Sequence, residues 1–202
     1  MQRFAYMTYD DNALAQPHIE DADEALVPLA LEDDRSFAVL VERYAAKLRR
    51  YVMRFINCSA DDAEDIVQTT FINAYRNLND FDTGLKFSSW IYRIAHNEAV
   101  SHVRRTAARS SMPWEDDKLE ALASDVDVET DLHRKMDSAS VRAAVDRLDA
   151  KYKEVLVLRY FEDKSYGEIS DILRKPQGSV SSLITRAKRL LAAELKKAAS
   201  RS

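Results

Sequence analysis

Apolar residues recur at intervals of three and four positions through most of this 202-residue chain, and this periodicity restricts the fold more than any other feature. The segment DAEDIVQTTFINAYRN, residues 62–77, is representative, with apolar or small residues at Ala63, Ile66, Val67, Thr70, Phe71, Ala74 and Tyr75. Such a stripe is typical of a helix that packs against a core. No segment shows the sustained alternation of a half-buried strand, and only 3 Gly and 4 Pro interrupt the chain. The pattern predicts an all-α protein.

Charge alternates along the chain, although the net charge is only −4. Residues 1–34 carry 1 basic and 9 acidic groups, and residues 111–140 carry 3 and 9. The two periodic blocks are basic, with 12 basic and 8 acidic groups in residues 35–110 and 14 and 8 in residues 141–202. We therefore predict an acidic extension (1–23), a helical domain (24–109), a flexible acidic linker (110–134) and a second helical domain (135–202). Each basic block could bind a polyanion.

Several classes of protein are disfavoured by what the sequence lacks. A single cysteine, Cys58, excludes a disulfide framework and a cysteine-cluster zinc site. His96 and His102 are six positions apart and fall on different sides of a helix, so metal ligation is not expected. The sequence has no Gly-rich phosphate loop, secretory signal or membrane-spanning run, and an enzyme is the weakest interpretation. We predict a cytoplasmic protein without a cofactor.

The C-terminal block has the layout of a helix-turn-helix. A short helix with Ser165 and Glu168 at capping-box spacing is followed by the turn RKPQ and a long basic helix. The core side of the long helix is predicted to hold Val180, Leu183, Ile184, Ala187, Leu190 and Leu191. Its outer side offers hydroxyl and basic groups that suit base edges and phosphates, at Ser179, Ser181, Ser182, Thr185, Arg186, Lys188 and Arg189. The alternatives are a solvated basic face and a surface for oligomer packing.

A second candidate for nucleic-acid binding is KFSSWIYRIAHNEAVSHVRR, residues 86–105, which joins the end of a loop at residues 79–89 to a helix that is expected to begin at Trp90. Aromatic side chains can stack on bases, arginines can hold phosphates, and Asn97 and Ser101 lie one helical turn apart, which suits an unpaired base edge. Trp90 could equally be a core residue. The candidate residues are Phe87, Ser88, Ser89, Trp90, Arg93, Asn97, Ser101, Arg104 and Arg105.

The helix at residues 62–77 has a second face that also suits contact with a partner. This face carries acids, an amide and an outward-pointing apolar residue, namely Asp62, Glu64, Asp65, Gln68 and Ile72. An apolar residue ringed by polar groups is typical of a modest protein interface. The alternative is an acidic helix N-terminus beside one stray exposed isoleucine, and both interpretations can hold together.

Taken together, these three blocks resemble the extracytoplasmic-function (ECF) sigma factors of bacterial transcription initiation, over about residues 24–196. The resemblance implies that the acidic face of residues 62–77 binds the β′ coiled coil of core RNA polymerase. It implies that the segment around Trp90 binds the −10 promoter element, with a pocket for a flipped base in the loop 82–89, and that residues 179–189 read the −35 element. It also implies contact with the polymerase β flap and an anti-sigma partner, but neither covalent chemistry nor a homo-oligomer.

This chain departs from the family pattern at three positions: the family commonly has an acid at Ser101 and basic residues at Ser181 and Leu183. Promoter sequence is therefore not predicted, and DNA binding without polymerase is expected to be weak and salt-sensitive. Two other functions stay open, a sigma mimic that titrates an anti-sigma factor and an ordinary helix-turn-helix regulator. The acidic tail or linker could also cover a basic face and weaken DNA binding.

Overall fold

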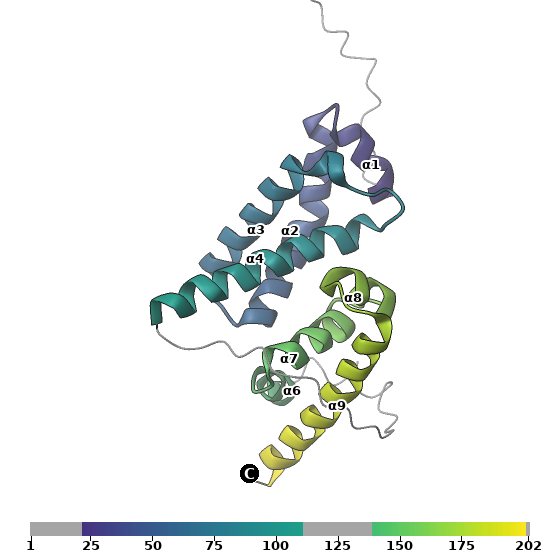
Figure 1. The fold of residues 1–202 in the computed structure, drawn as a ribbon. Coiled ribbons are helices and arrows are strands. Elements are labelled where there is room, and N and C mark those ends of the chain that lie inside the picture. Colours follow the sequence, from purple (N-terminus) through teal and green to yellow (C-terminus); the bar gives the residue numbers. More distant parts are fainter. Residues whose placement is uncertain (1–21, 111–138, 201–202) are drawn as a thin grey trace, which may run out of the picture.

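The computed structural model describes residues 22–110 and 139–200, which form two packed groups of helices (Figure 1). The first group contains α1 (Asp23–Ala30), α2 (Asp34–Ile56), α3 (Ala60–Arg76), the short 3₁₀ turn η1 (Leu78–Asp80) and α4 (Phe87–Ser110). The second contains α6 (Ala139–Asp146), α7 (Ala150–Leu156), the π-helical turn η2 (Val157–Phe161), α8 (Tyr166–Leu173) and α9 (Gln177–Ala199). All regular elements in these residues are helical, which confirms the predicted all-α fold. The acidic extension to residue 21 and most of the predicted linker lie outside the described residues.

Local sequence signals set the ends of the helices in the first domain. The Asn57 backbone adopts a left-handed conformation (φ 51°) that ends α2. Ser59 then caps α3, because its Oγ accepts a hydrogen bond from the Asp62 amide at 3.0 Å. The apolar stripe of α2 is buried against α3 and α4, as its periodicity predicts, at Phe37, Leu40, Tyr44, Leu48, Tyr51, Val52 and Phe55.

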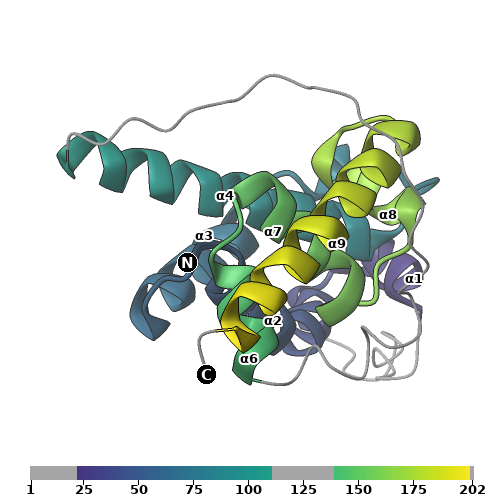
Figure 2. The same cartoon turned by 90° about the horizontal axis from the view of Figure 1, so that it is seen from below.

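The second domain contains the predicted helix-turn-helix. Ser165 and Glu168 form a capping box at the start of α8, with each side chain bonded to the other residue's amide. Arg174, at φ 51°, ends α8, and α9 begins three residues later and crosses α7 (Figure 2). Most of the predicted core residues of α9 are buried, but Leu190 is 37% exposed and does not belong to the core. Ala187 and Leu191 fill the buried side of this part of α9, and Leu190 lies beside them at the surface.

Helix α4 begins at Phe87, three residues before the predicted start at Trp90. The Phe87 amide donates a hydrogen bond to Glu24 Oε1 at 3.0 Å, so a residue of α1 caps α4 from a distance of 63 positions. Residues 87–89 therefore form the first turn of a helix and do not belong to the loop. A cap supplied by another helix leaves no signal in the local sequence.

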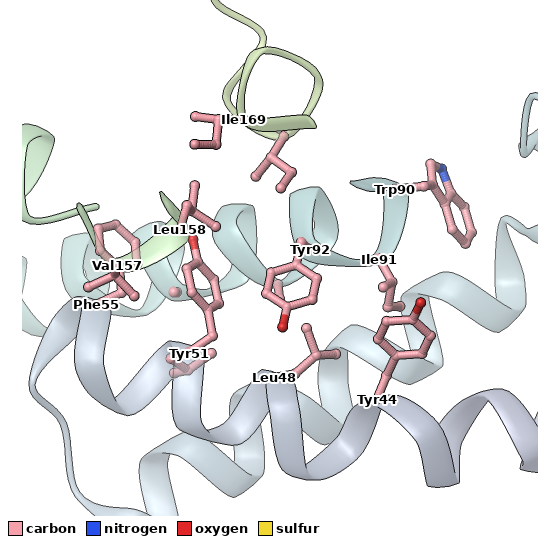
Figure 3. Close-up of a cluster of buried hydrophobic side chains, with 14 of the residues drawn as sticks. Tyr44, Leu48, Tyr51, Phe55, Trp90, Ile91, Tyr92, Val157, Leu158 and Ile169 are labelled. Carbon is pink, nitrogen blue, oxygen red and sulfur yellow. The ribbon is translucent and has the colours of Figure 1, made fainter. Parts of the chain in front are cut away.

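The two domains pack directly on each other, which the sequence analysis did not predict. Helix α8 lies along α4, while α7 and η2 contact α2. Leu158 and Ile169 of the second domain lie beside Tyr51 and Tyr92 of the first, in one continuous cluster of buried side chains (Figure 3). The contact between the domains is therefore partly a shared hydrophobic core.

Glutamates of the second domain supply the polar part of the contact. Glu162 Oε2 accepts a hydrogen bond from the Tyr92 hydroxyl at 2.6 Å, and its Oε1 lies 3.4 Å from Arg54 Nη1. Glu154 Oε1 accepts from the Tyr51 hydroxyl at 3.4 Å and pairs with His96 Nδ1. Because each of these carboxylates is at least partly removed from water, its partners in the first domain are needed to compensate for the lost hydration.

Candidate functional site

The outer face of α3 presents the predicted protein-binding residues side by side. Glu64, Asp65, Gln68 and Ile72 are exposed, and the Ile72 side chain is 45% accessible to solvent. The buried stripe of the same helix packs on α2 and α4, so these residues point away from the core. A rigid helix therefore carries one apolar side chain among polar groups, as expected for a docking surface.

The acids on this face have different surroundings. Asp62 accepts a hydrogen bond from Ser59 Oγ at 2.6 Å, and this bond and the charge of His102 hold the pKa of Asp62 below its ordinary value. Glu64 lies 3.5 Å from Arg49 of α2. Asp62 therefore helps to cap α3, while Asp65 is exposed one turn further along, on the same side as Gln68 and Ile72. Asp62 is therefore engaged in capping, whereas the Asp65 side chain faces solvent.

Tyr75 extends this face, contrary to its assignment to the buried stripe. Its side chain is 48% exposed, with the ring edge-on to Phe37 at 5.1 Å and the hydroxyl donating to Asp34 Oδ1 at 2.6 Å. Periodicity alone misplaces Tyr75 because it lies at the edge of the apolar stripe, where a tyrosine can pack one face of its ring and expose the other. Its position three residues after Ile72 was the available signal.

The start of α4 buries three of the residues predicted to contact the −10 element. Phe87 is fully buried, and Ser89 and Trp90 are 3% and 7% exposed. The rings of Phe87 and Trp90 are 5.7 Å apart, and Phe81 lies within 5.8 Å of both. In this arrangement the aromatic side chains fill the core of the first domain, which is the alternative that the sequence left open for Trp90.

Further along α4, the other predicted residues of this group form a stripe on one side of the helix. Arg93 and Ser101 are half-buried, and Asn97, Arg104 and Arg105 are exposed. The pKa of Arg93 is lowered by burial and by the charge of Arg174, which follows α8. Helix α8 also packs on α4, so the second domain lies close to the half-buried Arg93 and partly covers the N-terminal end of this stripe.

Helix α9 presents its outer side at the surface of the second domain. Ser182, Thr185 and Arg186 are exposed, while Ser179, Ser181, Lys188 and Arg189 are half-buried. The Arg186 guanidinium lies 5.7 Å from the centre of the Tyr152 ring, a cation–π contact that can orient the side chain. A Cβ placed on Gly178 would meet no atom within 4 Å, so the start of α9 is open to close approach.

The structure thus leaves two of the predicted surfaces, on α3 and α9, exposed on different domains and partly covers the third, on α4. Within the described residues there is no cluster of His, Cys, Asp or Glu that could hold a metal ion. No helix in the same residues combines the length and apolar character needed to cross a membrane.

Comparisons with known proteins give matches for both domains. The family model for Sigma-70 region 2 matches residues 40–109, and the model for Sigma-70 region 4 matches residues 138–191. The ECF RNA polymerase sigma factor SigW of Bacillus subtilis is 32% identical over 171 residues, which cover 81% of this chain and 91% of SigW. The RNA polymerase sigma-H factor of Pseudomonas aeruginosa is 33% identical over 177 residues, or 84% of this chain and 91% of that protein.

Solved structures share the two-domain fold. CnrH, solved in complex with the cytosolic domain of CnrY, gives a TM-score of 0.64 at 26% identity, over 88% of this chain and 99% of CnrH. The sigma factor RpoE of Bartonella quintana, solved with the anti-sigma factor NepR, gives 0.60 at 22% identity, over 80% of this chain and 98% of RpoE, and shows the fold alone. The chain therefore belongs to the extracytoplasmic-function sigma factors and is an alternative sigma factor for transcription initiation.

Proposed function

We propose that each of the three surfaces binds a different partner during transcription initiation. The outer face of α3 docks on the β′ coiled coil of core RNA polymerase, the outer side of α9 reads the −35 duplex, and α4 binds the −10 element. The observation that carries this assignment is the exposed face of α3, because its acids and Ile72 belong to a helix whose other side is fully used by the core. The polymerase makes the phosphodiester bonds, and the chain performs no catalysis itself.

Binding of the −35 duplex would use side chains that differ in reach. The hydroxyls of Ser182 and Thr185 let the helix approach the major groove closely, and Arg186 can pair two acceptors on a guanine edge. Lys188 and Arg189 would hold phosphates. Ser182 Oγ already donates to the Gly178 carbonyl at 2.9 Å, so its oxygen remains able to accept a hydrogen bond from a base.

The −10 element would first contact a stripe of side chains on α4, namely Arg93, Asn97, Ser101, Arg104 and Arg105. The buried aromatic residues would contact it later. Unstacking a base pair costs on the order of 1.4 kcal/mol per step, which contacts to a flipped base can offset. Phe87, Ser89 and Trp90 would reach a base only after the start of α4 rearranged, and Ser88, which is half-buried, needs the smallest change. The second domain would also have to move off Arg93.

We propose in addition that the protein acts in the cytoplasm, bound to polymerase, and that a separate anti-sigma protein regulates it. CnrH offers support for such a partner, because it was solved together with the cytosolic domain of a second protein. Because the two domains are in direct contact, one partner could bind both of them at once.

The test is run-off transcription with purified core polymerase on a pool of promoter fragments. We expect selective transcripts with the wild-type protein and their loss in Asp65→Ala and in Arg186→Ala. Glu42→Ala on α2 and Arg147→Ala after α6 are the matched controls, because each removes an exposed side chain of the same charge that belongs to none of the three surfaces. A folded protein that produced no selective transcript, yet bound an anti-sigma factor, would overturn the proposal and favour the sigma mimic.

A further inference from the structure

Basic side chains gather where the two domains meet. Lys47, Arg50 and Arg54 are spaced at i, i+3 and i+7, which places them along one side of α2. Lys86 directly precedes α4, and Lys164 directly precedes the capping residue of α8. We name these five residues the seam strip.

Contacts and electrostatic effects connect the members of the seam strip. Lys164 is buried, with its Nζ 4.3 Å from the centre of the Tyr92 ring. Burial lowers the pKa of Lys164, the carboxylates of Glu168 and Glu162 raise it, and the positive charges of Lys47 and Lys86 lower it. Burial raises the pKa of Glu162, and the positive charges of Arg54 and Arg50 both lower it. The strip therefore runs from α2 across the boundary to the second domain.

Two carboxylates of the second domain sit on the strip. Glu162 Oε1 lies 3.4 Å from Arg54 Nη1, and Glu168 Oε1 lies 3.1 Å from Lys86 Nζ. Two acids do not neutralise five cations, and Lys47 and Arg50, both exposed, form no ion pair within the described part of the chain. The two glutamates occupy positions that external anions could take if the domains separated.

The chemistry of the strip favours a nucleic-acid backbone over an acidic peptide. The three basic residues on α2 span about 10 Å of helix, a length over which one strand of duplex DNA offers about three phosphates. A peptide partner would need apolar anchors as well. The exposed large apolar side chains of the first domain, Leu29, Leu31, Ile72 and Tyr75, lie on other elements.

We propose that the seam strip binds the phosphodiester backbone of DNA, that Glu162 and Glu168 cover part of it while the domains are in contact, and that it is fully available when they part. The inference rests on the proposed function for the identity of the polyanion. It adds a sequence-independent contact on α2 to the promoter contacts proposed for α4 and α9.

The test measures the salt dependence of DNA binding by the full chain without polymerase, using fluorescence anisotropy. The probes are a labelled oligo(dT) and a duplex without promoter sequence, titrated between about 50 and 200 mM salt. In Lys47→Ala/Arg50→Ala, the slope of log K against log salt should become shallower by about 1.8 on the duplex or about 1.4 on the single strand. The probe that shows the change identifies the form of DNA that the strip binds.

Arg49→Ala is the matched control, because Arg49 is exposed on the same helix but pairs with Glu64 of α3. The slope of log K against log salt for Arg49→Ala should equal that of the wild type. Glu162→Ala should steepen the wild-type slope on the duplex by about 0.9 or more, since it frees Arg54 for one further phosphate and favours separation of the domains, which exposes the rest of the strip. An unchanged slope in either Lys47→Ala/Arg50→Ala or Glu162→Ala would overturn the inference.

A polyglutamate competitor separates DNA from acidic peptides. If it displaced the DNA probes as well as unlabelled DNA did at equal charge, the strip would be a general acidic-partner site, and its assignment to DNA would be wrong. The binding assay contains no polymerase, and its variants leave α3 and α9 unchanged. Selective run-off transcription with an unchanged salt slope would therefore reject only the seam strip, whereas the opposite result would reject only the proposed promoter function.

Discussion

Replacing Glu162 by alanine should release the second domain from the first. The Glu162 side chain is only 5% exposed, and its two oxygens contact Tyr92 at 2.6 Å and Arg54 at 3.4 Å, both in the first domain. Alanine would leave the Tyr92 hydroxyl without its acceptor in a buried site. The Arg54 guanidinium would lose its ion pair and keep its contact to the Phe161 ring, at 4.6 Å.

The expected magnitude follows from these contacts. A hydrogen bond to a charged group contributes about 1.5–3 kcal/mol, and the pair with Arg54 contributes at most about 1 kcal/mol because Arg54 is partly exposed. Burial raises the pKa of Glu162 despite the hydrogen bond from Tyr92, so the desolvation of the carboxylate offsets part of this gain. We therefore expect a loss of about 2 kcal/mol in the free energy of domain contact, or an increase of about 30-fold in the equilibrium constant for separation.

Single-molecule energy transfer between the domains measures this constant. Cysteines introduced at the exposed positions Ala46 in α2 and Ala193 in α9, in a Cys58→Ser background, carry the dyes. Glu194→Ala is the control, because it removes a glutamate that pairs with Lys197 on α9 itself. An identical distribution of transfer efficiencies in wild type and Glu162→Ala, with both folded, would refute the assigned role of this carboxylate.

Three other predictions concern single elements. Ser165→Ala removes the capping box of α8 and should lower the free energy of unfolding by about 1 kcal/mol in urea denaturation, whereas Ser165→Asp should retain most of it. Burial raises the pKa of Glu168, but hydrogen bonds from Ser165 and Lys86 outweigh this effect and lower the pKa from 4.5 to about 2. The free energy of unfolding should therefore fall as the pH drops from about 4.5 towards 2. That decline should become shallower in Glu168→Gln, and an equal slope in both proteins would contradict the assignment. Ile72→Ala should change the free energy of unfolding by less than about 0.5 kcal/mol, because the side chain is half-exposed, yet weaken binding to core polymerase about fivefold or more in a titration.

Much of the helical structure is predictable because its signals are local. The stripe of α2, the serine cap of α3 and the capping box of α8 each depend on residues within a few positions of one another. The outward orientation of Asp65, Gln68 and Ile72 follows from the same periodicity, since residues opposite a buried stripe must face solvent. The resemblance to sigma factors, which the comparisons confirm, also depended on short motifs in order along the chain.

The remaining features depend on contacts between distant residues. Glu24 caps α4 from another helix, and Phe81 completes the aromatic cluster that buries Phe87 and Trp90. Leu190 and Tyr75 fit a helical stripe, but only the neighbouring helices decide how far that stripe is covered. The role of each aromatic residue near α4 could therefore not be settled from its spacing.

The sequence by itself determined the helical stripes, the local caps of α3 and α8 and most of the outward-facing side chains of α3 and α9, because these depend on interactions within one helix and on its apolar pattern. Only the tertiary structure decided that the two domains share a core and that the start of the α4 stripe is partly covered. It also decided which first-domain residues contact the buried glutamates: Tyr51 and His96 contact Glu154, and Tyr92 and Arg54 contact Glu162. The physical reason is that a glutamate on a helix gives no local sign of its burial. Its environment is set by residues about 60 to 110 positions away, whose approach depends on how whole domains pack.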